Sequence, residues 1–324
     1  MLKPDALTSL SIAIEAALVG GRTILDVAAA GGDQPEAKRD GSPVTEADTS
    51  AEKAILAVLQ RRGSLYPVIA EEMWDRNRAP AGNPPAGPWW AVDPLDGTKE
   101  FVKGLPEYTV NLALVSDGVP CVGVVYLPAA DRLYAGLTGL GAWRIDHASL
   151  TPLPAAPGGV TPAIPEHWIP LPLGGPGPAA GGQNHAAGVP GGHSPAAGDI
   201  GGQTSATARA VIAISRSHGA ADTEAFLRRL ESAGLPVQES PLGSSAKFCT
   251  TAEGLTDCYP RFTSTKVWDC AAGAAVLLAA GGLVADHQGG KLLFDPVEIL
   301  LPPLVCFRPG APQQFRDTIY AHIT

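Results

Sequence analysis

The 324-residue sequence lacks an excess of basic side chains, a long apolar run and paired cysteines. With 23 Lys and Arg against 32 Asp and Glu, its net charge of −9 offers no positive field to attract nucleic acid or anionic lipid. Its longest apolar stretch, residues 271–285, is shorter than the roughly 20 residues of a membrane-spanning helix. Asp5 and Glu15 interrupt the place where a secretory signal needs apolar residues. We therefore expect a globular cytoplasmic protein without a transmembrane segment; peripheral contact with the inner membrane and the oligomeric state stay open.

The five cysteines form no CxxC pair, which argues against a zinc site and a disulfide framework. We expect unpaired, partly buried thiols of a reducing compartment. Cys270 follows an aspartate that is a candidate ligand below, so its thiol is a candidate for redox sensitivity.

Apolar periodicity predicts two helices at the start of the chain, over residues 7–30 and 45–62. Buried strands are expected over 66–70 and 89–92, with a Gly/Pro/Asn-rich loop at 79–88 between them. Short apolar runs joined by turns then predict an antiparallel meander from Thr109 to about Trp143.

Residues 151–208 are rich in Gly, Pro and Ala and contain no lysine, so we expect a flexible insertion whose scattered histidines (His167, His185 and His193) bind no metal. Beyond it, the pattern predicts a strand at 211–214, a helix at 222–233, strands near Val237 and over 255–259, and a helix that opens at Asp269. The expected organisation is an N-terminal α+β half (1–150), the insertion (151–208) and a C-terminal α/β half (209–324).

Carboxylates follow both predicted buried strands and recur at the last predicted helix. They are Glu71 with Glu72, Asp93, Asp96 and Asp269. Each has a local explanation, such as turn formation for Asp96 or helix capping for Asp269. Converging in one cleft, however, they would repel one another unless divalent cations lay among them, and oxygen ligands without His or Cys select Mg²⁺.

The stretch 93–98, DPLDGT, allows both aspartates to face one side of a tight turn. Its proline restricts the backbone and leaves the Leu95 carbonyl free as a ligand. Gly97 and Thr98 then begin a short helix whose N–H groups can receive a phosphate oxygen. The DxDGT motif of haloacid-dehalogenase-type phosphatases differs, because its aspartates are one residue closer together.

These motifs resemble the signature of the lithium-sensitive, magnesium-dependent phosphatase superfamily of inositol monophosphatase. Within it, the chain resembles the CysQ-type 3′(2′),5′-bisphosphate nucleotidases in six stretches: DGSPVTEAD (40–48), DPLDGTKEF (93–101), EYTVNLAL (107–114), GSSAKFC (243–249), AEGLTDCYPRF (252–262) and VWDCAAG (267–273). The resemblance implies an alternating α-β-α-β-α sandwich with the active site between the two halves.

The resemblance also implies the roles of individual residues. Two or three Mg²⁺ ions would be held by Glu71, Asp93, the Leu95 carbonyl, Asp96 and Asp269. Thr98 would orient the attacking water, and Asp48 would accept its proton or hold Thr98, although Thr45 and Asp48 also form the pattern of a helix capping box. Substrate contacts would come from Gly97, Thr98, His218, Ser244, Lys247, Arg261 and Asp269; a purely structural role stays open for His218, Lys247 and Arg261.

The implied reaction is hydrolysis of the 3′-phosphate of adenosine 3′,5′-bisphosphate to AMP and phosphate, with the sulfated analogue (PAPS, giving APS) as a second substrate, in support of sulfate assimilation. One alternative is the same chemistry on inositol monophosphate or a sugar phosphate. Another is a non-catalytic protein that senses nucleotides. In every case the expected partner is a small phosphorylated molecule and not a nucleic acid.

Overall fold

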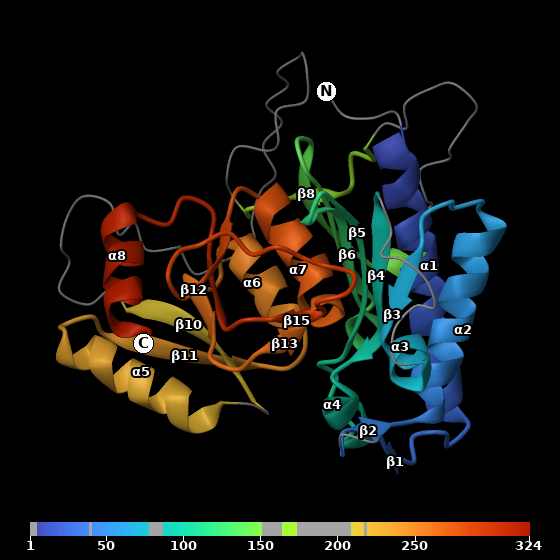
Figure 1. The fold of residues 1–324 in the computed structure, drawn as a ribbon, viewed down its shortest axis with the longest axis horizontal. Coiled ribbons are helices and arrows are strands. Elements are labelled where there is room, and N and C mark those ends of the chain that lie inside the picture. Colours follow the sequence, from blue (N-terminus) through green and yellow to red (C-terminus); the bar gives the residue numbers. More distant parts are fainter. Residues whose placement is uncertain (1–4, 39–40, 78–86, 151–163, 174–208, 217–218) are drawn as a thin grey trace.

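The protein stacks helices and sheets in five alternating layers (Figure 1). The structure is a computed structural model, which describes residues 5–38, 41–77, 87–150, 164–173, 209–216 and 219–324. In order, the layers are α1 (Asp5–Ala29) with α2 (Glu46–Arg61), a seven-stranded sheet, α6 (Ala246–Glu253) with α7 (Val267–Ala279), a five-stranded sheet, and α5 (Ala220–Ser232) with α8 (Gln313–His322). The expected α-β-α-β-α sandwich is confirmed.

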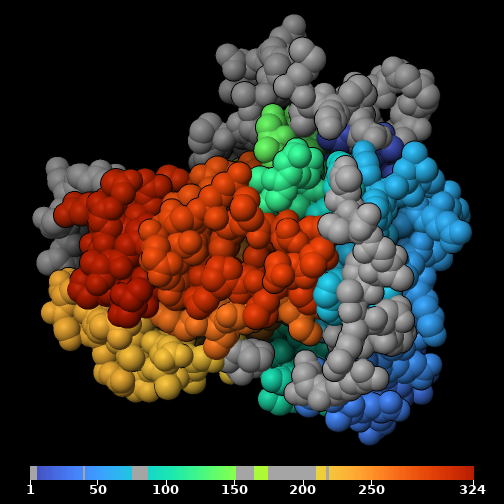
Figure 2. All heavy atoms as spheres, in the orientation of Figure 1, coloured from blue at the N-terminus to red at the C-terminus, as the bar shows by residue number. Residues whose placement is uncertain are grey.

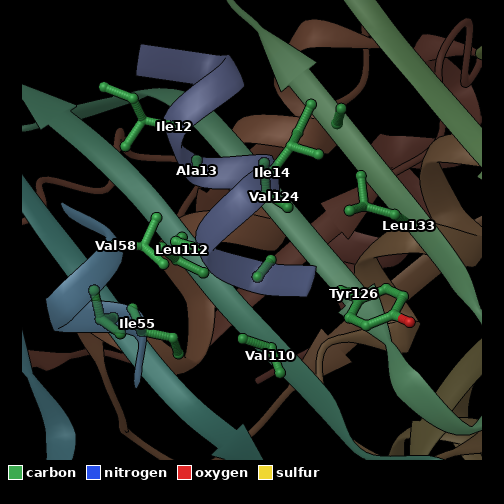
Figure 3. Packing of buried hydrophobic residues seen from close by; sticks show 14 of the residues in the cluster. Ile12, Ala13, Ile14, Ile55, Val58, Val110, Leu112, Val124, Tyr126 and Leu133 are labelled. Carbon is green, nitrogen blue, oxygen red and sulfur yellow. The ribbon is translucent and has the colours of Figure 1, made fainter. Parts of the chain in front are cut away.

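Helices α1 and α2 lie at the predicted positions and pack together on the outer face of the first sheet. Thr45 caps α2, and the Asp48 side chain accepts the Thr45 backbone N–H in return, so the predicted capping box is present. Ile14 of α1 and Ile55 of α2 interdigitate with sheet residues such as Leu112 (Figure 3). Burial of these apolar faces is what fixes the two helices to the sheet.

The seven-stranded sheet has the order β3-β4-β5-β6-β7-β8-β9, in which β3 and β4 are parallel and every other pair is antiparallel. Its strands are β3 (Val68–Ala70), β4 (Trp89–Asp96), β5 (Thr109–Ser116), β6 (Val119–Leu127), β7 (Arg132–Leu137), β8 (Gly141–Asp146) and β9 (Ile169–Pro170). The predicted meander is confirmed. Strand β4 runs further than expected, through the DPLD stretch, with an irregular register between Asp93 and Asp96.

The last strand departs from the expectation for 151–208. Residues 164–173 are not a loose linker: Pro170 of β9 pairs with Trp143, the Trp168 ring lies 6.1 Å from the Trp143 ring, and Leu171 is buried. This segment has too few apolar side chains to show a periodicity in the sequence, but those it has pack against the edge of the sheet. The rest of that segment, with His185 and His193, lies outside the described residues, as does most of the loop predicted at 79–88.

Helix α7 packs closely against the inner face of this sheet, because the residues where helix and sheet meet are small. A Cβ on Gly123 of β6 would lie 2.4 Å from the Ala272 carbonyl oxygen, and one on Gly273 would lie 2.5 Å from the Phe248 ring of α6. The two halves of the sequence therefore share one apolar core, and the start of α7 is brought to the carboxyl end of β4.

The second sheet has the order β11-β10-β12-β16-β14, with parallel pairing of β10 to β11 and β12 and antiparallel pairing elsewhere. Its strands are β10 (Ala210–Ser215), β11 (Val237–Leu242), β12 (Cys258–Arg261), β14 (Leu283–Asp286) and β16 (Leu304–Phe307). The strand predicted at 255–259 starts later, because Gly254 ends α6 in a left-handed conformation and a turn follows.

The remaining elements are short. Five of them supply residues to the site described below: β2 (Pro43–Val44), α3 (Glu71–Asn77), α4 (Thr98–Val102), β13 (Thr265–Lys266) and β15 (Leu300–Leu301). The others are β1 (Glu36–Ala37) and the 3₁₀ turns Pro128–Ala130 and Ala148–Leu150. In the space-filling view the C-terminal elements, yellow to red, occupy one end and the N-terminal helices, blue, the other (Figure 2). No helix of the described ranges is both long and apolar enough to cross a membrane.

Candidate active site

A cavity of about 430 Å³ lies where β4 and α4 meet the start of α7 and the loop before α6. The cavity is lined by ten of the residues singled out from the sequence: Glu71, Asp93, Leu95, Asp96, Gly97, Thr98, Ser244, Lys247, Arg261 and Asp269. Residues as far apart in the chain as Glu71 and Asp269, 198 positions, therefore supply one site.

Three carboxylates converge at one side of the cavity. Glu71, Asp93 and Asp269 each place an oxygen within 4.8 Å of the other two. Burial raises the pKa of Glu71 to about 8, against the opposing effect of Lys38, and the charge of Asp269 adds to the rise. Burial and the charges of Glu71, Asp96 and Asp269 hold the pKa of Asp93 well above its ordinary value, against the opposing effect of Lys38. Such a cluster favours either protons or a bound cation.

The DPLD turn is held by its own side chains. Asp93 is buried, and its Oδ1 accepts the Leu95 backbone N–H at 3.0 Å. Burial and Asp269 raise the pKa of Asp96 to about 6. Gly97 follows at φ 94°, a left-handed conformation that turns the chain into α4.

Thr98 and Asp48 form a hydrogen-bonded pair behind the turn. The Thr98 hydroxyl donates to Asp48 Oδ1 at 2.9 Å and also lies 3.2 Å from the Leu95 carbonyl oxygen. Asp48 is buried, and its Oδ2 accepts from the N–H and hydroxyl of Thr45, both at 2.7 Å. Burial raises the pKa of Asp48, and the hydrogen bonds from Thr45 oppose that rise. Asp48 thus both caps α2 and touches the cavity residue Thr98.

Two cations also line the cavity, Lys247 and Arg261. Lys247 on α6 is buried, and its Nζ donates to the Ser244 carbonyl at 2.6 Å. Burial lowers the pKa of Lys247 to about 8, and the nearby charge of Asp96 opposes the fall. The Nε of Arg261 is buried and has no hydrogen-bond partner among the described residues. These side chains suit an anionic group on a ligand.

Sequence reasoning missed Lys38, which lies between the first two short strands. Its Nζ contacts Glu71 Oε1 at 2.8 Å and Glu72 Oε1 at 2.6 Å, and its side chain is 8% exposed. These two carboxylates raise the pKa of Lys38 although burial lowers it. A single ammonium cannot neutralise Glu72 and the three converging carboxylates at once, so excess negative charge remains in the cluster.

A second missed group ties the two halves together beneath the cavity. The buried Ser245 hydroxyl lies 3.0 Å from Asp96 Oδ2 and 2.9 Å from the Asp269 carbonyl oxygen, and it accepts from Asn111 Nδ2 at 2.9 Å. Glu52 of α2 holds the start of α3 in place, because its carboxylate accepts the backbone N–H of Glu72. No local pattern in the sequence marks either residue.

Two further expectations from the sequence concern His218 and Cys270. His218 lies outside the described residues, so its relation to the cavity stays a prediction. The five cysteines are free, and Cys270 is fully buried, which raises its pKa to about 12. The proposed redox sensitivity of Cys270 is therefore unsupported, since the thiol is inaccessible and protonated at neutral pH.

A five-layer sandwich whose cavity gathers clustered carboxylates and a threonine hydroxyl hydrogen-bonded to a buried aspartate has the architecture of a metal-dependent phosphatase. The chain belongs to the inositol monophosphatase family, whose family model matches residues 5–161 and 196–318. The members of this family are metal-dependent phosphatases.

Comparison with individual proteins refines this assignment. The chain is 35% identical over 269 residues to the 3′(2′),5′-bisphosphate nucleotidases CysQ of Shigella flexneri and Escherichia coli (strain K12), covering 82% of this chain and 85% of each relative. The crystal structure of CysQ from Bacteroides thetaiotaomicron is 32% identical and superposes with a TM-score of 0.66, covering 93% of this chain and 97% of that one. The resemblance drawn from the motifs is confirmed.

Proposed function

We propose that this protein is a magnesium-dependent 3′(2′),5′-bisphosphate nucleotidase, which hydrolyses adenosine 3′,5′-bisphosphate to AMP and phosphate. One observation carries the proposal: the same cavity joins a carboxylate cluster to two cations, the buried Lys247 and the partly buried Arg261. A substrate with two phosphates fits this division, with the scissile phosphate at the cluster and the other beside the cations. The names of the similar CysQ proteins support it.

The donor set suits magnesium. Glu71, Asp93, Asp96, Asp269 and the Leu95 carbonyl offer only hard oxygen ligands, and no His or Cys lines the cavity among the described residues. We assign these five groups to the binding of two or three ions. Bound magnesium would stabilise negative charge on the phosphate and lower the pKa of a water molecule.

Thr98 and Asp48 would manage the proton of the attacking water. Because the Thr98 hydroxyl donates to Asp48 in the structure, its lone pairs are left to accept from a water in the cavity. Asp48 can then take a proton through Thr98 as the water attacks, and its raised pKa suits that task. No covalent intermediate on the protein is required.

The substrate would be held mainly by the second half of the chain. We assign Ser244, Lys247 and Arg261 to the phosphates and nucleoside, with Gly97, Thr98 and Asp269 near the scissile phosphate and His218 near the nucleoside. This corresponds to a functional division into residues 1–150 for metal binding and 209–324 for substrate binding, with 151–208 inserted between them.

Several finer properties belong to the same proposal. PAPS, which carries the same 3′-phosphate, would be hydrolysed to APS, and the activity would serve sulfate assimilation in the cytoplasm. Lithium is expected to inhibit, because a monovalent ion in a magnesium site leaves the charge balance incomplete.

The test is to measure phosphate release from adenosine 3′,5′-bisphosphate and from inositol 1-phosphate in parallel. We expect magnesium-dependent release from the nucleotide, abolished by EDTA and reduced by lithium. Arg261→Met should reduce the preference for the nucleotide over inositol 1-phosphate, whereas exposed Arg228→Met on α5 should not. A preference for inositol phosphate would favour an inositol or sugar-phosphate phosphatase. Nucleotide binding without phosphate release from either compound would favour a sensing protein.

A further inference from the structure

Glu107 lies two residues before the start of β5 and connects the first half of the chain to two loops of the second half. Its Oε2 accepts the Gly243 backbone N–H at 2.9 Å, and its Oε1 lies 2.9 Å from Arg216 Nη2. The Arg216 guanidinium also donates to the Pro241 carbonyl from Nε at 3.2 Å and from Nη2 at 3.1 Å. One carboxylate therefore fastens the ends of the neighbouring strands β10 and β11 to the sheet that carries the metal-ligand candidates.

The fit around Glu107 is close on its backbone side as well. A Cβ on Gly243 would lie 2.7 Å from the Glu107 carbonyl oxygen, and one on Gly97 would lie 3.2 Å from the same atom. The backbone of Glu107 thus lies against both the turn at Gly97 and the loop of residues 243–245 that precedes α6, and both glycines must approach it without a side chain.

That loop shapes one wall of the cavity. Ser244 adopts φ 45°, a left-handed conformation that is uncommon for a residue other than glycine, and it lines the cavity with Lys247. Lys247 braces the loop from within by donating to the Ser244 carbonyl, and Glu107 holds it from outside through Gly243. Glu107 itself does not line the cavity, so its effect on a ligand must pass through the loop.

We propose that Glu107 is a positioning residue that sets the affinity for the nucleotide part of the substrate by holding in place loop 243–245 and the start of α6 with Lys247. This proposal rests on the function proposed above for Ser244 and Lys247. Removing the negative charge of Glu107 would break its pair with Arg216 and weaken its bond to Gly243. The metal-ligand candidates and the Thr98–Asp48 pair do not contact its side chain in any interaction described, so the loss should fall on binding and not on chemistry.

The kinetic test compares Glu107→Gln with Glu239→Gln, a matched control on β11 whose side chain is exposed. Glu107→Gln should raise KM for adenosine 3′,5′-bisphosphate about tenfold, the lower end expected for a charge-assisted bond because Arg216 is partly exposed. Its kcat should stay within about twofold of the wild type, and hydrolysis of 4-nitrophenyl phosphate, which lacks a nucleoside, should fall much less. Equal losses on both substrates, or no loss on either, would overturn the proposal.

Hydrogen exchange separates this proposal from the proposed function, because it does not depend on any activity. Amide exchange in the peptide containing residues 241–247 should accelerate in Glu107→Gln and stay unchanged in Glu239→Gln. Unchanged exchange in both variants would refute the role of Glu107 whatever the enzyme hydrolyses. Faster exchange in an enzyme that does not hydrolyse the bisphosphate would keep the positioning role for the loop, overturn its link to nucleotide affinity, and refute the proposed function.

Discussion

Magnesium binding should release protons, because the carboxylate cluster holds them in the metal-free protein. With a pKa of about 8, Glu71 is protonated in about nine molecules of ten at pH 7, and Asp96, with a pKa of about 6, in about one of ten. Asp93, whose pKa is raised well above its ordinary value, adds to this release. Assembly of the metal site at pH 7 should therefore release at least about one proton.

Isothermal titration calorimetry in two buffers of different ionisation enthalpy measures this number directly. The release should decrease as pH rises above 8, where Glu71 is already ionised in the metal-free protein. The dissociation constant for Mg²⁺ should correspondingly fall by at least about tenfold per pH unit near pH 7 and less steeply above pH 8. An affinity independent of pH, or a release of less than about half a proton at pH 7, would refute this account of the cluster.

The free energy of unfolding of the metal-free protein should also depend on pH through Glu71, and it should decrease as pH rises. The folded-state pKa of Glu71 is raised above its ordinary value of 4.5, so the contribution of Glu71 to stability is full below pH 4.5 and is lost as pH rises through about 8. Between pH 4.5 and 7 this loss amounts to about 3 kcal/mol. In urea unfolding, saturating magnesium should therefore stabilise the protein more at pH 7 than at pH 5, compared with EDTA.

Three further predictions concern single residues. Thr98→Val should lower kcat by about 10² to 10⁴-fold by removing the route to Asp48, while calorimetry still detects magnesium binding; loss of that binding would point to a metal-holding role instead. Ser245→Ala should reduce the free energy of unfolding by about 1–3 kcal/mol, because it removes a buried hydroxyl with three partners, and an unchanged urea midpoint would contradict this. Gly123→Ala should destabilise by about 1–3 kcal/mol because its Cβ would clash with α7, whereas Gly87→Ala, with open space around it, should be close to neutral.

The sequence predicted those parts of the molecule that depend on local pattern. The helix capped by Thr45, the antiparallel meander and the carboxylates after β3 and β4 could each be read from residues close in the chain. The burial of Trp168 could not be predicted in this way, because it depends on contact with Trp143, which lies on β8 in an earlier part of the chain. The residues that support the site were missed for the same reason: Lys38 meets Glu71 across 33 positions, and Ser245 meets Asp96 across 149.

The charge distribution explains why an acidic chain can bind an anionic substrate in one orientation. The protein carries a net charge of −9, so attraction at long range is absent, and recognition must act at contact. In the cavity the carboxylates of Glu71, Asp93 and Asp269, wherever they are ionised, repel a phosphate unless cations lie among them, whereas Lys247 and Arg261 attract one directly. Without magnesium a bisphosphate should therefore bind by its non-scissile phosphate alone, and EDTA should weaken its binding without abolishing it.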